Sequence, residues 1–186
     1  MRAPIKRIAT GIDVGTHATR VVVVEHSRGE APRIIGTGVS ETRGLRHGYI
    51  VNKIDAMRSI ERAIENAEKM AGFKIKNAFL SVGGISLESV ISHGTAIISR
   101  ASSEVSKIDI RKADTEAEEN LPHLTNKRII YRTPLRYKLD SKEVLGDPCG
   151  MTGTKLEVKL LFVTCLEQHL DDIIRTIEEL GIEVDE

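Results

Sequence analysis

Residues 11–25 read GIDVGTHATRVVVVE, and the four consecutive valines in this stretch constrain the fold more than any other feature. β-Branched side chains favour the pleated, buried surface of a sheet, so the valine run predicts an interior strand. A turn around Gly15 separates this strand from an apolar stretch that begins at residue 7. A third β-like segment, residues 33–41, follows a polar turn. We therefore expect an antiparallel three-stranded meander at the head of the chain.

A helical pattern follows the meander. Residues from Asp55 to about Met70 carry apolar side chains at helical spacing, and Gly72 is a stop signal. The predicted buried stripe is Met57, Ile60, Ala63, Ile64, Ala67 and Met70. The next strand, residues 77–84, ends at a double glycine. Three strands, a helix and a further strand thus make a first structural unit.

After Gly84 the pattern changes to short β-like pieces around a charged segment. In the strand-rich part, residues 127–140, Pro134 predicts an edge strand or a bulge, because proline cannot donate a ladder hydrogen bond. The charged segment, residues 106–120, predicts a helix. We expect residues 85–150 to form a small inserted α+β module.

The start of that charged helix has its own signal. Ser106 is a suitable N-cap residue, and Asp109 lies three residues further on, where a capping box has its acidic partner. Because aspartate takes the place of the usual glutamate or glutamine, the pattern is a weaker relative of the capping box.

The last part of the chain returns to the pattern of the first unit. Residues 146–165 supply a turn-rich loop and a long strand, and residues 166–180 predict a helix that Gly181 ends. The chain finishes at IEVDE, which is typical of the beginning of another strand, so we expect a fragment of a longer protein. Residues 1–84 and 151–186 are predicted to form one discontinuous unit.

Composition excludes some function classes. Lysine plus arginine and aspartate plus glutamate both total 27, and aromatic residues make up only 3%, which argues against nucleic-acid binding. Cys149 and Cys165 form no CxxC motif and suit a reducing cytoplasm as packing residues. The N-terminus lacks the apolar segment of a secretory signal, and no segment approaches the roughly 18 apolar residues of a membrane span. We expect a cytoplasmic chain.

The turn after the first strand has the chemistry of a phosphate site. Gly15 can adopt a positive φ and let an anion approach the backbone, and the amides of Gly15, Thr16 and His17 can form an anion-binding nest. The Thr16 hydroxyl can add a hydrogen bond, and Asp13 can hold Mg²⁺ through water. Taken alone, however, this stretch favours a plain hairpin over a phosphate site.

Other chemistries lack their motifs. The turn matches neither GxxxxGK[ST] nor a GxGxxG that opens a helix. The six histidines show no metal-ligand spacing, and no GxSxG nucleophile motif is present. No catalytic residue is therefore assigned.

Several segments together resemble the actin-like ATPases, and among them the FtsA family of bacterial cell-division proteins. The first hairpin, GIDVGTHATRVVVVE, is similar to the first phosphate hairpin of the superfamily. RGLRHGYIVN, AIENAEKMAGFKI and LSVGG follow in the order found in FtsA. YRTPLRYKLD and the long segment from GDPCGMTGTKLEVKLL to the end extend the resemblance from about Ile8 to Asp185.

This resemblance implies an α/β fold: an actin-like (ribonuclease H-like) subdomain with a mixed sheet and flanking helices, interrupted by a small α+β insert. It also implies a site for ATP and Mg²⁺, in which Asp13 is the Mg²⁺-associated acid. Gly15, Thr16 and His17 would form the first phosphate loop. A lysine common in the family two residues after the Gly-Ser/Thr pair is Ala18 here, with Arg20 nearby.

The same resemblance implies partners. FtsA links the FtsZ ring to the membrane, polymerises like actin and recruits later division proteins. We expect self-association and partner binding through an exposed strand edge in the insert, with Ile129, Tyr131 and Arg132 as contact residues. The family's His-x-x-Pro is Tyr131-x-x-Pro134 here. The FtsZ-binding subdomain and the membrane helix are expected beyond Glu186. The full-length protein is expected at the cytoplasmic face of the cell membrane at the division site.

An actin-like site lies between two lobes, and one lobe supplies only part of its contacts. We therefore expect these 186 residues to bind Mg-ATP weakly or undetectably and not to hydrolyse it. Three other interpretations stay open. The first is a relative of the pilus-assembly actin homologue PilM, the second is a small-molecule kinase of the same superfamily, and the third is an α+β adaptor without a ligand.

Overall fold

The computed structural model describes residues 7–122 and 124–185 and divides the chain into two units. Unit 1 consists of the residues up to Ser86 together with those from Glu167 onward, and unit 2 is Leu87–Leu166. Residues 1–6 and Glu186, which the sequence assigned to the first unit, lie outside the described residues, as does His123.

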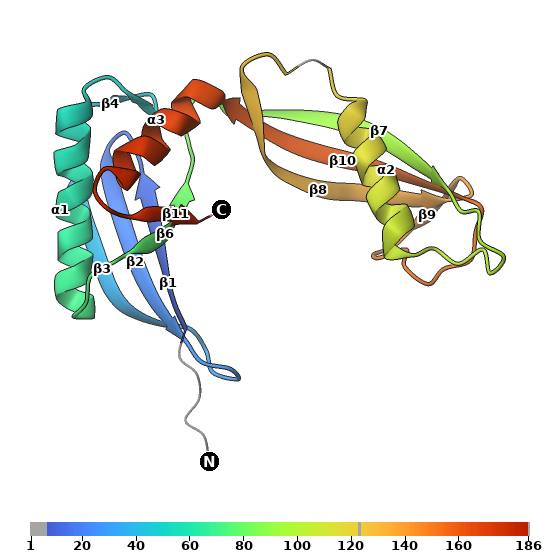
Figure 1. Ribbon diagram of the computed structural model, residues 1–186, viewed down its shortest axis with the longest axis horizontal. Helices are drawn as coiled ribbons and strands as arrows, with labels where there is room; N and C mark the ends of the chain where they lie inside the picture. Colours follow the sequence, from blue (N-terminus) through green and yellow to red (C-terminus); the bar gives the residue numbers. More distant parts are fainter. Residues whose placement is uncertain (1–6, 123, 186) are drawn as a thin grey trace. The chain divides into compact units, whose positions relative to one another are not determined.

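Unit 1 is built on a five-stranded mixed sheet (Figure 1). Its strands are β1 (Arg7–Val14), β2 (Ala18–His26), β3 (Arg33–Glu41), β6 (Asn77–Ser81) and β11 (Glu183–Asp185). β1, β2 and β3 form the predicted antiparallel meander, while β6 and β11 run parallel to β1 in the order β11-β6-β1-β2-β3. The strand expected at the end of the chain is thus confirmed. The loop after β3 contains a short hairpin, β4 (Leu45–Arg46) and β5 (Tyr49–Ile50).

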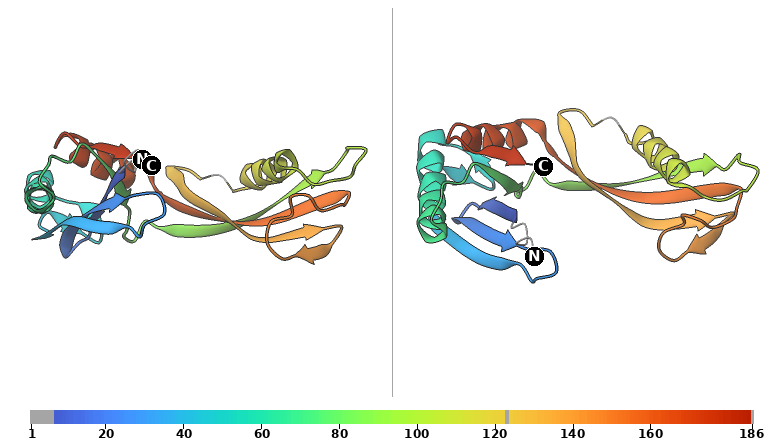
Figure 2. Two further views of the ribbon diagram at one scale, coloured as in Figure 1. Left: turned by 90° about the horizontal axis from the view of Figure 1, so that it is seen from below. Right: turned by 60° about the horizontal axis from the view of Figure 1, so that its bottom comes forward.

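Two helices, α1 (Lys53–Ala71) and α3 (Glu167–Glu178), pack on the same core of unit 1 (Figure 2). α1 begins two residues before the predicted start, because the Asn52 side chain accepts a hydrogen bond from the Asp55 N–H at 3.2 Å. It ends at Gly72, which has the left-handed φ of 83° that the predicted stop requires. Met70 was wrongly assigned to the buried stripe, since it is 61% exposed. No helix among the described residues has the length and hydropathy of a membrane span.

Unit 2 is a four-stranded antiparallel sheet with one helix on it (Figure 1). The elements are β7 (Glu88–Ile97), α2 (Lys107–Glu119), β8 (Lys127–Leu139), β9 (Lys142–Val144) and β10 (Lys155–Leu166). The strand order is β7-β10-β8-β9. The register of β8 against β10 shifts beside Pro134, where Lys159 pairs with Arg136 and Leu160 pairs with Pro134. The bulge predicted from this proline is therefore confirmed.

The second boundary between the units differs from the predicted one. The sequence placed the strand at 151–166 in the first unit, but β10 pairs with β7 along one side and with β8 along the other. Its buried residues, Phe162 among them, belong to the core of unit 2. The chain therefore passes between the units after Ser86 and after Leu166, rather than after residues 84 and 150. The strand's apolar pattern shows that it is buried but not which sheet contains it.

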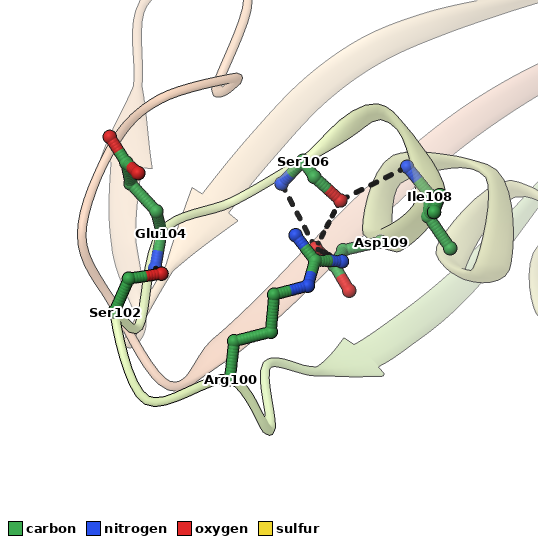
Figure 3. Close-up of polar contacts among 6 residues, drawn as sticks. All are labelled: Arg100, Ser102, Glu104, Ser106, Ile108 and Asp109. Carbon is green, nitrogen blue, oxygen red and sulfur yellow. Dashed lines mark hydrogen bonds and ion pairs between the residues drawn. The ribbon is translucent and has the colours of Figure 1, made fainter.

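The start of α2 contains the predicted capping box (Figure 3). The Ser106 hydroxyl accepts from the Ile108 N–H, and the Asp109 carboxylate accepts from the Ser106 N–H at 2.9 Å and the Ser106 hydroxyl at 2.7 Å. Arg100 donates to the same carboxylate at 3.0 Å. These hydrogen bonds from Ser106, and secondarily the charge of Arg100, lower the pKa of the buried Asp109 below its ordinary value of 3.8.

We expect unit 2 to lose stability in acid through Asp109. Because the pKa of this carboxyl is lower in the folded chain than in the unfolded chain, its contribution is complete above about pH 4 and is lost as the pH falls through the folded value. The measurement is the free energy of unfolding against pH for the wild type and Asp109→Asn, with Asp147→Asn as an exposed control. An equal acid slope in wild type and Asp109→Asn would contradict this assignment.

Candidate phosphate-binding turn

The turn between β1 and β2 consists of Gly15, Thr16 and His17, and the last two residues are exposed. The Gly15 N–H donates to the Ala18 carbonyl at 3.2 Å and so closes the hairpin. Gly15 does not use the positive φ that is open to a glycine, because its φ lies outside the left-handed region. The turn needs a glycine for another reason: a Cβ here would lie 2.9 Å from the Ala18 carbonyl oxygen.

The next two backbone amides differ from that of Gly15. Across the described residues 7–122 and 124–185, the N–H groups of Thr16 and His17 have no hydrogen-bond acceptor. They are adjacent and at the surface, where an anion can reach them. The donors that this turn offers to a phosphate therefore include these two amides and the Thr16 hydroxyl.

The loop after β3 holds the turn in place. The Gly48 N–H donates to the Thr16 hydroxyl oxygen at 2.9 Å, which leaves the hydroxyl hydrogen able to donate elsewhere. The Thr42 N–H donates to the His17 carbonyl at 3.1 Å. The Thr42 hydroxyl also shares a buried 2.8 Å hydrogen bond with Thr19 at the start of β2. The turn is thus fixed at both of its exposed residues before any ligand arrives.

Asp13 lies at the end of β1, directly opposite Arg20 on β2. The Asp13 carboxylate is 3.4 Å from the Arg20 guanidinium, and both side chains are about half exposed, at 48% and 59%. Within the described part of the chain no three His, Cys, Asp or Glu side chains are grouped to hold a metal ion. A single carboxylate fits an Mg²⁺ that keeps most of its water, but not a metal site made of protein ligands alone.

An apolar groove adjoins Asp13, and sequence reasoning missed it. It lies on the face of the sheet opposite the helices, because its residues alternate along the strands with those that the helices cover. The groove has a volume of about 610 Å³ and includes Asp13, Val22, Val39 and Phe79. Val39 and Phe79 are 60% and 50% exposed. The valine run could have revealed this face, because every second residue of β2 must point away from the helices.

The residues expected to contact partners do not share one surface. Tyr131 is 59% exposed and pairs with Val163. Ile129 packs against the core of unit 2, and Arg132 forms a 3.0 Å ion pair with Glu118 of α2. The residues do share an edge: β9 pairs only with the last three residues of β8, so among the described residues no strand pairs with the other side of 127–136.

The architecture defines the class of protein. A solved structure of the PilM–PilN type IV pilus biogenesis complex superposes with a TM-score of 0.59 over 95% of this chain and 45% of that chain, at 13% identity. That identity supports the fold alone. The mixed sheet of unit 1 and the α+β insert confirm the predicted actin-like fold class.

Sequence comparison gives the particular relatives. Residues 84–164 match the family described as the SHS2 domain inserted in FtsA. The chain is 31% identical to FtsA of Pseudomonas aeruginosa over 97% of its length, 30% identical to that of Bacillus subtilis over 93%, and 24% identical to that of Escherichia coli K12 over 100%. It spans 42%, 39% and 44% of these three relatives. The predicted resemblance is therefore confirmed: over nearly its whole length the chain is similar to the FtsA cell-division proteins.

Proposed function

We propose that this chain is the part of an FtsA-like cell-division protein that contributes half of an ATP site and a partner-binding insert. The observation that carries the proposal is the pair of adjacent amides of Thr16 and His17, for which the described part of the chain supplies no acceptor. Such amides, held in place beside a hydroxyl and a strand-end carboxylate, are suited to bind phosphate oxygens.

Each residue of the site has a distinct role in this proposal. The amides of Thr16 and His17 and the Thr16 hydroxyl bind phosphate oxygens, while Gly15 shapes the turn. Asp13 accepts hydrogen bonds from the water shell of Mg²⁺, and Arg20 restrains its carboxylate. The nucleotide supplies the phosphoryl chemistry when bound, and the rest of its contacts come from a second lobe. No residue of this chain is assigned a catalytic role, so no hydrolysis is expected.

The 186 residues are expected to bind Mg-ATP with a dissociation constant of about 1 mM or weaker, since only a few exposed hydrogen bonds form. NMR titration with Mg-ATP should move the amide peaks of Thr16 and His17 first. Thr16→Val, which keeps both amides but loses the hydroxyl, should weaken the response several-fold. Thr37→Val, at an exposed site on β3, is the matched control.

Two outcomes would contradict this proposal. A micromolar dissociation constant would show that one lobe is sufficient. Saturating Mg-ATP that moves peaks elsewhere and leaves Thr16 and His17 unchanged would exclude the turn as the phosphate site.

The insert is proposed to bind partners through the edge of β8 that faces away from β10, along which no strand of the described residues pairs before Tyr137. This edge offers backbone groups for strand addition, and Tyr131 provides an exposed aromatic contact. Self-association into actin-like polymers, and binding of FtsZ and later division proteins by the full-length protein, follow from the FtsA relationship. So does its place at the cytoplasmic face of the division-site membrane, with the membrane contact made by another segment.

PilM-like pilus assembly is the second candidate, and the superposition with the PilM–PilN complex favours it. That likeness concerns the fold, whereas the insert matches the FtsA-type family. The division role is therefore preferred. The interpretations as a small-molecule kinase and as a ligand-free adaptor have no comparable support.

A further inference from the structure

Gly48 connects the phosphate turn to a buried histidine. Its N–H donates to the Thr16 hydroxyl at 2.9 Å, and its carbonyl oxygen lies 2.6 Å from Nε2 of His169 in α3. A carbonyl only accepts, so Nε2 carries the hydrogen. Nδ1 of the same ring lies 2.6 Å from the Ser86 hydroxyl, which donates to Nδ1 when the ring is neutral. One chain of hydrogen bonds thus links Thr16, Gly48, His169 and Ser86.

The surroundings of His169 leave its ring little freedom. The ring is 2% exposed and stacks on Tyr49, with ring centroids 4.6 Å apart. The backbones of Gly48 and Gly84 are so close that a Cβ on Gly48 would lie 2.8 Å from the Gly84 Cα. A Cβ on Gly84 would also approach the His169 ring to 3.4 Å. A displacement of Gly48 must therefore be passed to the ring rather than absorbed by a void.

Ser86 and His169, at the far end of this series of hydrogen bonds, lie next in the sequence to the two points where the polypeptide enters and leaves unit 2. Ser86 is the last residue of unit 1 before the chain enters unit 2, and His169 is the third residue after it returns. We propose that His169 is a positioning residue that couples the phosphate turn to these two connections. A phosphate that accepts the hydrogen of the Thr16 hydroxyl shifts this oxygen and the Gly48 N–H that donates to it, and His169 carries the shift to Ser86.

The proposal rests on the proposed function for the identity of the ligand, but its test needs none. In the ligand-free chain, Thr16→Val should speed hydrogen exchange at the Gly48 amide about fivefold, because one neutral hydrogen bond is lost. It should also move the amide peaks of Ser86 and Leu87, which are about 70 positions away in the sequence. His17→Gln, on the same turn but outside the hydrogen-bond chain, should move neither.

The decisive comparison uses His169→Phe, which keeps a flat ring on Tyr49 but removes both ring hydrogen bonds. In that background Thr16→Val should no longer move the peaks of Ser86 and Leu87. A purely structural role for His169 predicts the same movement in both backgrounds, and that result would overturn the proposal. If His169→Phe does not fold, Ser86→Ala replaces it as the background, because it removes the hydrogen bond to Nδ1 and leaves the ring in place.

A measurement on the unaltered chain gives an independent check. The ¹⁵N shifts of His169 should show the hydrogen on Nε2, and a ring protonated only on Nδ1 would overturn the proposal. Because no nucleotide is present in these experiments, a negative result for the coupling would not contradict the proposed phosphate site. A negative result in the Mg-ATP titration would likewise not contradict the proposed coupling through His169.

Discussion

Gly38→Ala is expected to lower the free energy of unfolding of unit 1 by about 3 kcal/mol or more, because it overpacks a close helix–sheet contact. Gly38 lies in β3 beneath α1, and a Cβ at this position would be 1.8 Å from the Ala63 carbonyl oxygen and 2.8 Å from the Ala67 nitrogen. Both atoms belong to the helix backbone, so no side-chain rotation relieves the clash. Either α1 separates from the sheet or β3 bends.

Chemical denaturation followed by hydrogen exchange in α1 measures this effect. Gly83→Ala is the matched control, since a Cβ at Gly83 meets no atom within 4 Å and its φ is not left-handed. The control should change the free energy of unfolding by less than about 0.5 kcal/mol. Equal stabilities of the two variants would show that α1 does not pack on β3 as closely as described.

Phe162→Ala is expected to cost unit 2 about 3–5 kcal/mol, the usual range for removing a fully buried phenylalanine. Phe162 lies at the centre of β10 with 0% exposure and packs in a core that includes Ala113 and Ala117 of α2. Its removal leaves a cavity between the sheet and the helix. Hydrogen exchange in α2 should accelerate, while exchange in α1 should stay at the wild-type rate.

This pattern also tests the boundary between the units. Phe79→Ala makes the same chemical change at a 50% exposed position of unit 1 and should cost less than about 1 kcal/mol. If Phe162→Ala accelerates exchange in α1 instead, β10 belongs with unit 1, as its position in the sequence had suggested.

Local signals predicted most elements. The apolar spacing and Gly72 located α1 and its end, Ser106 and Asp109 located the start of α2, and Pro134 marked a bulge. These features depend on interactions within a few residues of each other. Met70 was misassigned because helical spacing defines a stripe but not how far the sheet extends beneath it.

The candidate site was predicted only in outline. The sequence predicts the turn residues, but the engaged amide of Gly15 and the exposed amides of Thr16 and His17 depend on how β1 and β2 close their hairpin. The role of Gly48 and His169 had no local signal, because these residues are 121 positions apart.

The sequence by itself determined the meander, the helices, the actin-like class and the FtsA resemblance, because periodicity, caps and motifs depend on residues that are close together in the sequence. Only the tertiary structure decided that β10 completes the sheet of unit 2, that α1 approaches β3 at Gly38, and that the buried His169 lies between Gly48 and Ser86. Each of these depends on which buried surfaces meet, and an apolar pattern specifies burial without specifying its partner.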